Sequence, residues 1–158
     1  KESWDSSLHP PTSIEHILMD IANYAIDTVV ITGGEPLMWN LQKLTTALKE
    51  QGKMIHLETS GTYSPAGNFD WVCLSPKKIE SPKHAIRLLA DELKVIIHNK
   101  HDFIWAEEQS LEVNDSCKLF LQPEWSKKEK VIPMIIDYVK ENTKWTISLQ
   151  SHKYMNIP

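Results

Sequence analysis

The sequence Gly-Gly-Glu-Pro, which begins at Gly33, has the residue types of a ligand-binding turn. The β-branched run Val29–Thr32 before it predicts a buried parallel strand. Gly33 and Gly34 let the backbone approach a ligand with no Cβ in between, and Glu35 adds a carboxylate beside the carbonyl oxygens. These acceptors suit an ammonium group, whereas a phosphate needs N–H donors at a helix N-terminus. We therefore expect an amine-binding turn rather than a phosphate-binding loop.

Polar residues also follow the other segments with the apolar pattern of strands. These groups are Glu58–Thr62, Ser75–Lys77, Gln122–Glu124 and Gln150–His152. The C-terminal ends of parallel strands lie at one edge of a sheet, where such folds bind their ligands. The sequence therefore predicts a single site to which all of these loops contribute.

The side chains in these groups suit a zwitterionic ligand with hydroxyl groups. Glu58 can bind a ribose hydroxyl or an ammonium group, and Lys77 offers a positive charge to a carboxylate. Gln122 presents both a donor and an acceptor, which suits the edge of a heterocycle. Short hydroxyl side chains and a histidine for an anionic group complete the set: Ser60, Ser75 and His152.

Strands that alternate with amphipathic helices must position these loops. Strands are expected at Thr28–Thr32, Met54–Leu57, Trp71–Leu74, Glu92–Ile97, Lys118–Leu121 and Thr146–Leu149. Helices are expected at Ser13–Ile26, Leu41–Gln51, Ser81–Ala90, His101–Gln109 and Lys127–Glu141. This alternation predicts an α/β fold with a parallel sheet. About six strands are too few for a closed eight-stranded barrel, so we expect a partial, open β/α barrel.

Composition excludes several classes of protein. The chain has 158 residues, 41% of them hydrophobic and 24% charged, which is ordinary for one globular domain over residues 1–158. A formal net charge of −4 argues against a nucleic-acid-binding protein, and no apolar run is long enough to span a membrane. Cys73 and Cys117 form no C-x-x-C motif and fit the reducing cytoplasm.

Taken together, the motifs resemble the family of 7-carboxy-7-deazaguanine synthases, which are radical S-adenosylmethionine (SAM) enzymes. The matching segments are Thr32–Pro36, Glu58–Thr62, Ser75–Lys77, Gln122–Pro123, Ser148–Lys153 and Ile157–Pro158. Gly-Gly-Glu-Pro is common to radical SAM proteins, whereas Ser-Pro-Lys and the Leu-Gln-x-His-Lys ending narrow the resemblance to this family.

The resemblance implies a lyase of the queuosine pathway that converts 6-carboxy-5,6,7,8-tetrahydropterin to 7-carboxy-7-deazaguanine with loss of ammonia. A deoxyadenosyl radical would begin the reaction by abstracting a hydrogen atom, so no side chain is assigned as a catalyst. The SAM-binding residues implied are Gly33, Gly34, Glu35, Glu58, Ser60, Ser75, Pro76 and Lys77. The pterin-binding residues implied are Thr32, Gln122, Pro123, His152 and Pro158.

One family motif is absent from the chain. Members carry C-x-x-x-C-x-x-C followed by Asp-Thr, which supplies three thiolates to a [4Fe–4S] cluster and a threonine to Mg²⁺. The chain instead opens with Lys1–Asp5, which is similar to the residues just after that motif. We therefore expect the cluster and Mg²⁺ ligands upstream of Lys1. The resemblance also implies a homodimer and an electron donor such as flavodoxin.

Two other functions stay open from the sequence. Another radical SAM enzyme, such as an activase of a glycyl-radical enzyme, would share Gly-Gly-Glu-Pro but lack the C-terminal motif. A SAM- or pterin-binding module without catalysis would lack the cluster motif altogether. The side of the sheet that Lys94 occupies is also open, because a strand lysine can face the barrel interior or extend outward.

Overall fold

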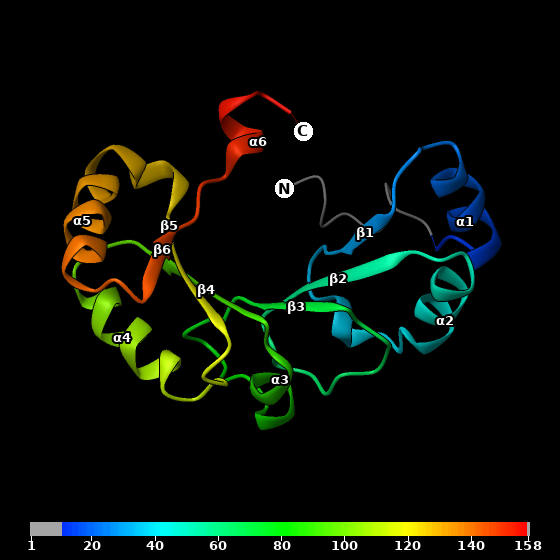
Figure 1. The fold of residues 1–158 in the computed structure, drawn as a ribbon, viewed down its shortest axis with the longest axis horizontal. Helices are drawn as coiled ribbons and strands as arrows, with labels where there is room; N and C mark the ends of the chain where they lie inside the picture. Colours follow the sequence, from blue (N-terminus) through cyan, green and yellow to red (C-terminus); the bar gives the residue numbers. More distant parts are fainter. Residues whose placement is uncertain (1–10, 158) are drawn as a thin grey trace.

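The computed structural model describes residues 11–157 and contains one curved parallel sheet (Figure 1). Its strands are β1 (Thr28–Ile31), β2 (Met54–Thr59), β3 (Trp71–Leu74), β4 (Glu92–Ile97), β5 (Lys118–Pro123) and β6 (Trp145–Ile147). Each strand pairs with the one before it in the chain, and β1 does not pair with β6. The predicted α/β fold with an unclosed parallel sheet is thereby confirmed.

The larger helices cover the convex side of this sheet, as Figure 1 shows. They are α1 (Ile14–Ala22), α2 (Gln42–Glu50), α3 (His84–Leu89), α4 (His101–Ser110) and α5 (Lys128–Glu141). The short helix α6 (Ser151–Tyr154) instead lies on the open, concave side. Two 3₁₀ turns, η2 (Pro36–Met38) and η3 (Trp125–Lys127), follow β1 and β5. Among the described residues, no helix is both long and apolar enough to cross a membrane.

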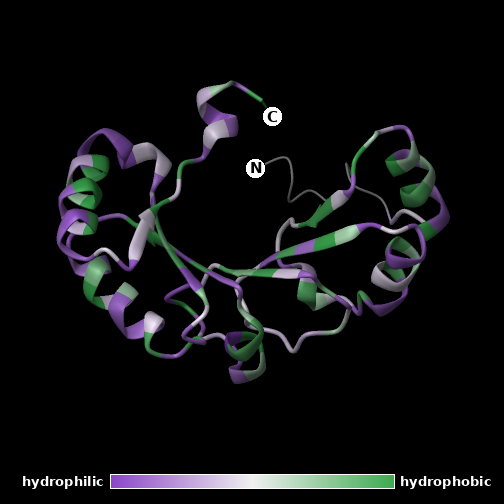
Figure 2. Cartoon of the chain, in the orientation of Figure 1, coloured by the Kyte–Doolittle hydropathy of each residue, from purple (hydrophilic) through white to green (hydrophobic). Residues whose placement is uncertain are grey.

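Alternation along the strands separates an apolar face from a polar one. Leu57 on β2 and Val95 on β4 point toward the helices and are fully buried in the core. Their neighbours Glu58 and Lys94 point to the other face and are only partly buried. Because successive side chains in a strand point to opposite faces, the same strands build both the core and a polar concave wall. Figure 2 shows the apolar faces of the helices turned toward the sheet.

The element boundaries differ from the sequence prediction at several ends. Helix α1 stops at Ala22 rather than Ile26, because the N–H of Asn23 already bonds the carbonyls of Asp20 and Ile21. Its apolar stripe is half covered, and none of its residues is buried. Strands β2 and β5 run two residues longer than predicted, to Thr59 and Pro123. Strand β6 lies earlier, and α6 and both 3₁₀ turns were not predicted, since single turns have no periodicity.

Candidate functional site

A cavity of about 680 Å³ lies against the concave face and the C-terminal ends of the strands. Most of the residues predicted to bind ligands line it: Thr32, Gly33, Gly34, Glu58, Ser60, Ser75, Lys77, Gln122 and His152. The structure therefore brings loops from five strands to one place. Three further predicted residues, Glu35, Pro76 and Pro123, lie beside the cavity wall without lining it, and Pro158 lies outside the described residues.

The two glycines of the turn differ in why they are glycine. Gly33 has a φ of +134°, a backbone conformation that other residues rarely adopt. At Gly34, in contrast, φ is ordinary and an added Cβ would meet no atom within 4 Å. The fold itself therefore does not need glycine at position 34. Its bare backbone faces the cavity, which fits the close approach of a ligand.

Glu35 holds the glycine turn against the end of β2. Its carboxylate accepts hydrogen bonds from Thr59 Oγ1 at 2.5 Å and Ser60 N at 2.7 Å, and also from the Ser60 hydroxyl. It further accepts from Leu37 N at 3.2 Å, which caps η2. The sequence predicts Glu35 as an anion for an ammonium group, but donors of the chain itself already surround this carboxylate. Direct contact of Glu35 with a ligand stays a prediction.

Lys94 faces the concave interior, which resolves the alternative that the sequence left open. Its Nζ lies 2.6 Å from Glu58 Oε2, and its side chain is only 14% exposed. Burial disfavours the charge of Lys94, but the Glu58 carboxylate beside it favours the charge, and the pKa of Lys94 is raised above the ordinary lysine value. The ion pair therefore fixes a charged lysine and the Glu58 carboxylate side by side in the cavity wall.

Lys77 brings a second ammonium group to the cavity, with Nζ 3.5 Å from Ser75 Oγ. Burial lowers the pKa of Lys77, and the positive charge of Lys94 lowers it further. An ammonium group whose charge is disfavoured in this way gains from a ligand carboxylate. This arrangement supports the carboxylate-binding role predicted for Lys77.

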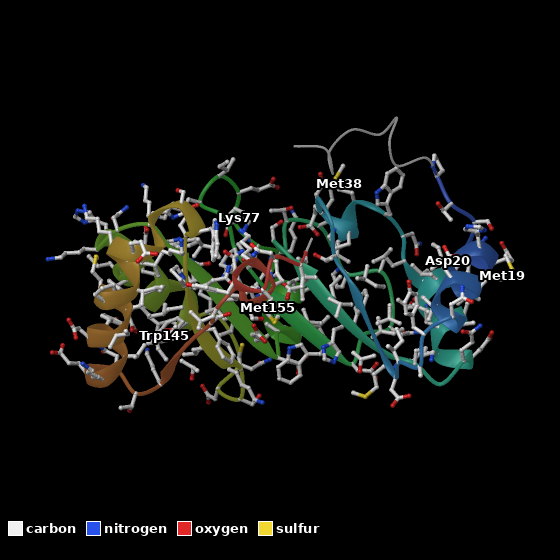
Figure 3. The ribbon with its side chains drawn as sticks, turned by 90° about the horizontal axis from the view of Figure 1, so that it is seen from above. Met19, Asp20, Met38, Lys77, Trp145 and Met155 are labelled. Carbon is white, nitrogen blue, oxygen red and sulfur yellow. The ribbon has the colours of Figure 1, made fainter. Side chains whose placement is uncertain are left out.

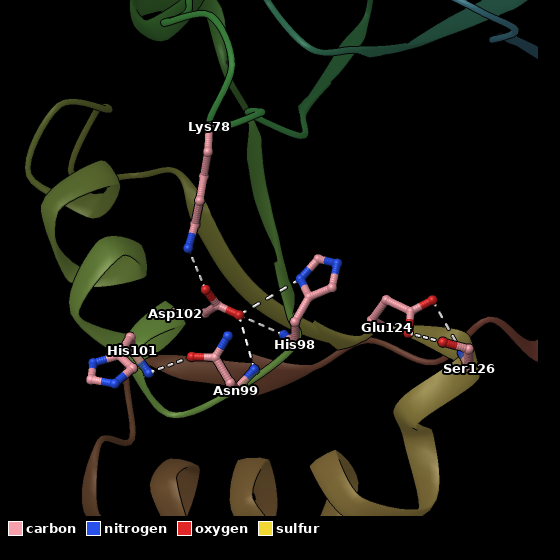
Figure 4. A network of polar contacts seen from close by, with 7 residues as sticks. All are labelled: Lys78, His98, Asn99, His101, Asp102, Glu124 and Ser126. Carbon is pink, nitrogen blue, oxygen red and sulfur yellow. Dashed lines mark hydrogen bonds and ion pairs between the residues drawn. The ribbon is translucent and has the colours of Figure 1, made fainter.

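Asp102 anchors the loop that carries Lys77 (Figure 4). Its carboxylate is 1% exposed and accepts hydrogen bonds from the Lys78 ammonium group and from the backbone N–H of His98 at 2.6 Å and Asn99 at 3.0 Å. Burial raises the pKa of Asp102, but these donors outweigh burial and lower it overall. Because Lys78 follows Lys77 directly, this network connects the loop after β3 to the start of α4.

Sequence reasoning missed several residues of the cavity wall, among them Glu92, Val30, Ile96 and Ser148. Glu92 accepts hydrogen bonds from Trp71 Nε1 at 3.3 Å and from the Cys73 thiol at 3.4 Å. A signal was present in β4, where Glu92, Lys94 and Ile96 alternate with fully buried apolar residues. The charged residues Glu92 and Lys94 at alternate positions indicate that one face of this strand meets water or a polar ligand, without saying which face of the sheet it is.

The charges on the wall balance, since it holds two lysines and two glutamates beside hydroxyl and amide groups. This donor and acceptor set fits a zwitterionic ligand, and the volume lies within the range of about 300–1,000 Å³ typical of small-molecule sites. A metal centre does not fit: residues 11–157 contain no group of three or more His, Cys, Asp or Glu side chains that could hold an ion.

Burial raises the pKa of the Cys73 thiol far above its ordinary value and that of Cys117 to about 11.

The relatives found by comparison with known proteins carry one and the same name. No family model matches the chain. A 7-carboxy-7-deazaguanine synthase from Flavobacterium psychrophilum is 55% identical over 158 residues, which are all of this chain and 75% of that protein. One from Synechocystis is 43% identical over 99% of this chain and 75% of that protein.

Among solved structures, the crystal structure of QueE from Escherichia coli superposes with a TM-score of 0.79 at 29% identity. The match covers 88% of this chain but 64% of that chain. The chain thus spans less than two thirds of this structural neighbour.

Proposed function

The chain belongs to the 7-carboxy-7-deazaguanine synthase family, and we propose that it carries out this family's reaction. That reaction is the radical SAM conversion of 6-carboxytetrahydropterin to 7-carboxy-7-deazaguanine, with loss of ammonia, in queuosine biosynthesis. The supporting observation is the polar cavity: residues from five strand ends gather in it, in a chain 55% identical along its whole length to a synthase of this name.

SAM is assigned to the part of the cavity near the glycine turn. The bare backbone at Gly34 suits the amino group of its methionine part, and the ammonium group of Lys77 suits the carboxylate. Glu58 and Ser60 supply oxygens for ribose hydroxyls. Glu35 and Pro76 lie beside this region, and Glu35 holds Ser60 in place through its backbone N–H.

The pterin is assigned to the opposite side of the cavity. Gln122 presents an amide whose Oε1 lies 3.3 Å from the hydroxyl of Ser148, so its free groups suit the edge of a pterin ring. His152 suits the pterin carboxylate, and Pro123 lies beside Gln122 on this side. Thr32 precedes the glycine turn, so it is proposed to contact the pterin from the SAM side of the cavity. Pro158 is proposed as a further residue of the pterin site.

The iron–sulfur cluster does not fit the described residues, so its ligands and that of Mg²⁺ are proposed to lie outside residues 11–157. In this family SAM and a [4Fe–4S] cluster supply the deoxyadenosyl radical. The task of this chain's own residues is to bind both molecules, orient them and exclude water. A cytoplasmic homodimer reduced by a donor such as flavodoxin completes the proposal.

The test is anaerobic turnover by the full-length protein with SAM, 6-carboxytetrahydropterin and a reductant, with the product identified by mass spectrometry. Gly34→Ala should leave the melting temperature unchanged, because its Cβ meets no atom of the chain. It should weaken SAM binding by about tenfold or more, since the methyl group lies where the ligand approaches. Gly52→Ala, in the turn after α2, is the control and should leave SAM affinity unchanged. Absence of product, or normal SAM affinity in Gly34→Ala, contradicts the proposal.

A further inference from the structure

The C-terminal segment reaches the cavity although almost none of it is buried. Helix α6 has no buried residue, and Tyr154, Met155 and Ile157 are each about half exposed. In Figure 1 this helix stands over the concave side, apart from the helices of the convex layer. Yet Gln150 and His152 line the cavity. A single exposed turn does not hold its position by its own hydrogen bonds, so the segment needs an attachment.

Trp125 provides that attachment. Its ring packs edge-on against Tyr154, with centroids 5.0 Å apart and an angle of 81° between the planes. The ammonium group of Lys153 lies 5.3 Å from the centroid of the same ring, and that of Lys128 lies 4.5 Å from it. The indole therefore contacts the two residues of α6 that come directly after His152. It makes a cation–π contact with Lys153 and an aromatic contact with Tyr154.

The turn η3 that carries the indole is capped by the residue that follows β5. Glu124 caps η3 by accepting hydrogen bonds from Ser126 N at 3.1 Å and Ser126 Oγ at 2.5 Å. Glu124 follows β5 directly, and β5 ends with the cavity residue Gln122 and with Pro123. The contacts of Trp125 thus connect α6 to β5, the strand whose end forms one wall of the site. In the view of Figure 3, Met155 and Lys77 both lie over the middle of the molecule.

We propose that Trp125 is a positioning residue that latches α6 over the cavity and so sets the place of His152. Trp125 does not line the cavity and acts through Tyr154 and Lys153. The substrate group concerned is the anionic end of the pterin, so this inference rests on the proposed function. Loss of the latch should weaken binding of the pterin and spare that of SAM, which is assigned to the far side.

The experiment uses the full-length protein and two readouts. Hydrogen exchange followed by mass spectrometry should show exchange about tenfold faster in residues 151–157 of Trp125→Ala, the size expected for loss of one aromatic and one cation–π contact. In steady-state kinetics the KM for 6-carboxytetrahydropterin should rise about tenfold, with kcat and SAM affinity nearly unchanged. Trp125→Phe keeps an aromatic ring and should restore most of both.

Two further variants keep the proposal falsifiable. Tyr154→Ala removes only the aromatic contact, so it should change exchange and KM in the same direction by a smaller factor, and the double variant should be no worse than Trp125→Ala alone. Leu111→Ala, which truncates an apolar side chain that is 83% exposed at the end of α4, is the control.

Faster exchange with an unchanged KM, or a parallel loss of SAM and pterin affinity, overturns the proposal, as does unchanged exchange. If the unaltered protein binds no pterin, the proposed function fails, and exchange in residues 151–157 alone decides whether Trp125 holds α6.

Discussion

Replacing Glu35 with alanine tests whether this carboxylate binds a ligand directly or supports the glycine turn. The substitution leaves three donors without their acceptor: the N–H of Leu37, the N–H of Ser60 and the hydroxyl of Thr59. The hydroxyl of Ser60 can turn to Thr62 Oγ1, which lies 3.2 Å away, so its loss should cost little. We expect Glu35→Ala to lower stability as well as SAM affinity.

The size of the stability loss follows from these donors. An orphaned buried donor costs about 1–3 kcal/mol, and the lower end applies because Glu35 and Ser60 are only partly buried. Three donors at about 1 kcal/mol each give about 3 kcal/mol. For a chain of 158 residues this loss corresponds to a fall in melting temperature of about 6–12 °C.

The assay is thermal and urea unfolding followed by circular dichroism, with SAM affinity measured on the full-length protein at a temperature where each variant is folded. Glu35→Gln keeps one acceptor oxygen and should lose about half as much stability. Glu50→Ala removes an exposed carboxylate from α2 and serves as the control. An unchanged melting temperature in Glu35→Ala refutes the reasoning. Lost SAM affinity with unchanged stability would instead favour the direct ammonium contact predicted from the sequence.

Three further predictions concern the network around Asp102, the glycines and the cysteines. Asp102→Ala should cost about 2–4 kcal/mol at pH 7, since two backbone N–H groups and Lys78 lose their acceptor. Because the pKa of Asp102 is lowered on folding, its stabilisation is fully present above the unfolded value of about 4 and is lost as the pH falls through the folded value. Urea unfolding of both proteins at pH 7 and pH 3 should therefore give a difference that shrinks in acid, and a constant difference would contradict this linkage. Gly61→Ala should cost about 2–4 kcal/mol, because its φ is +79° and the new Cβ would lie 2.7 Å from Leu74 Cδ1, whereas Gly52→Ala should cost about 1–2 kcal/mol for backbone strain alone. Equal melting temperatures for these two variants would refute the steric argument. Since burial raises the pKa of the Cys73 thiol, iodoacetamide at pH 8 should label this residue slowly in the folded chain and rapidly in urea; fast labelling of the folded chain, followed by mass spectrometry, would contradict this expectation.

Much of the fold was predictable because the strands carry strong local signals. The bounds of β3 and β4 match the prediction, and both consist largely of buried apolar residues flanked by polar ones. The gathering of strand-end loops at one cavity was predictable too, since it follows from parallel pairing alone. The motifs of the sequence then identified most of the residues that line the cavity.

The remaining features depend on distances between loops, which one sequence does not contain. The role of Glu35 arises because the loop after β1 lies against Thr59 and Ser60 at the end of β2. The side that Lys94 occupies was ambiguous, because a wet interior and the outer solvent leave the same alternation in a strand. The latch at Trp125 joins residues 29 positions apart through α6, a turn too short for a sequence pattern.

The order of the strands across the sheet has a consequence for how the molecule is made. Each new strand adds beside its immediate predecessor, so the nascent protein can assemble progressively as it leaves the ribosome. The ligand pocket, however, needs residues that directly follow β6 and a residue of the helix after it, which come after the other five strands in the chain. A truncated chain without β6 and α6 would therefore keep most of the sheet and still lack one side of the binding pocket.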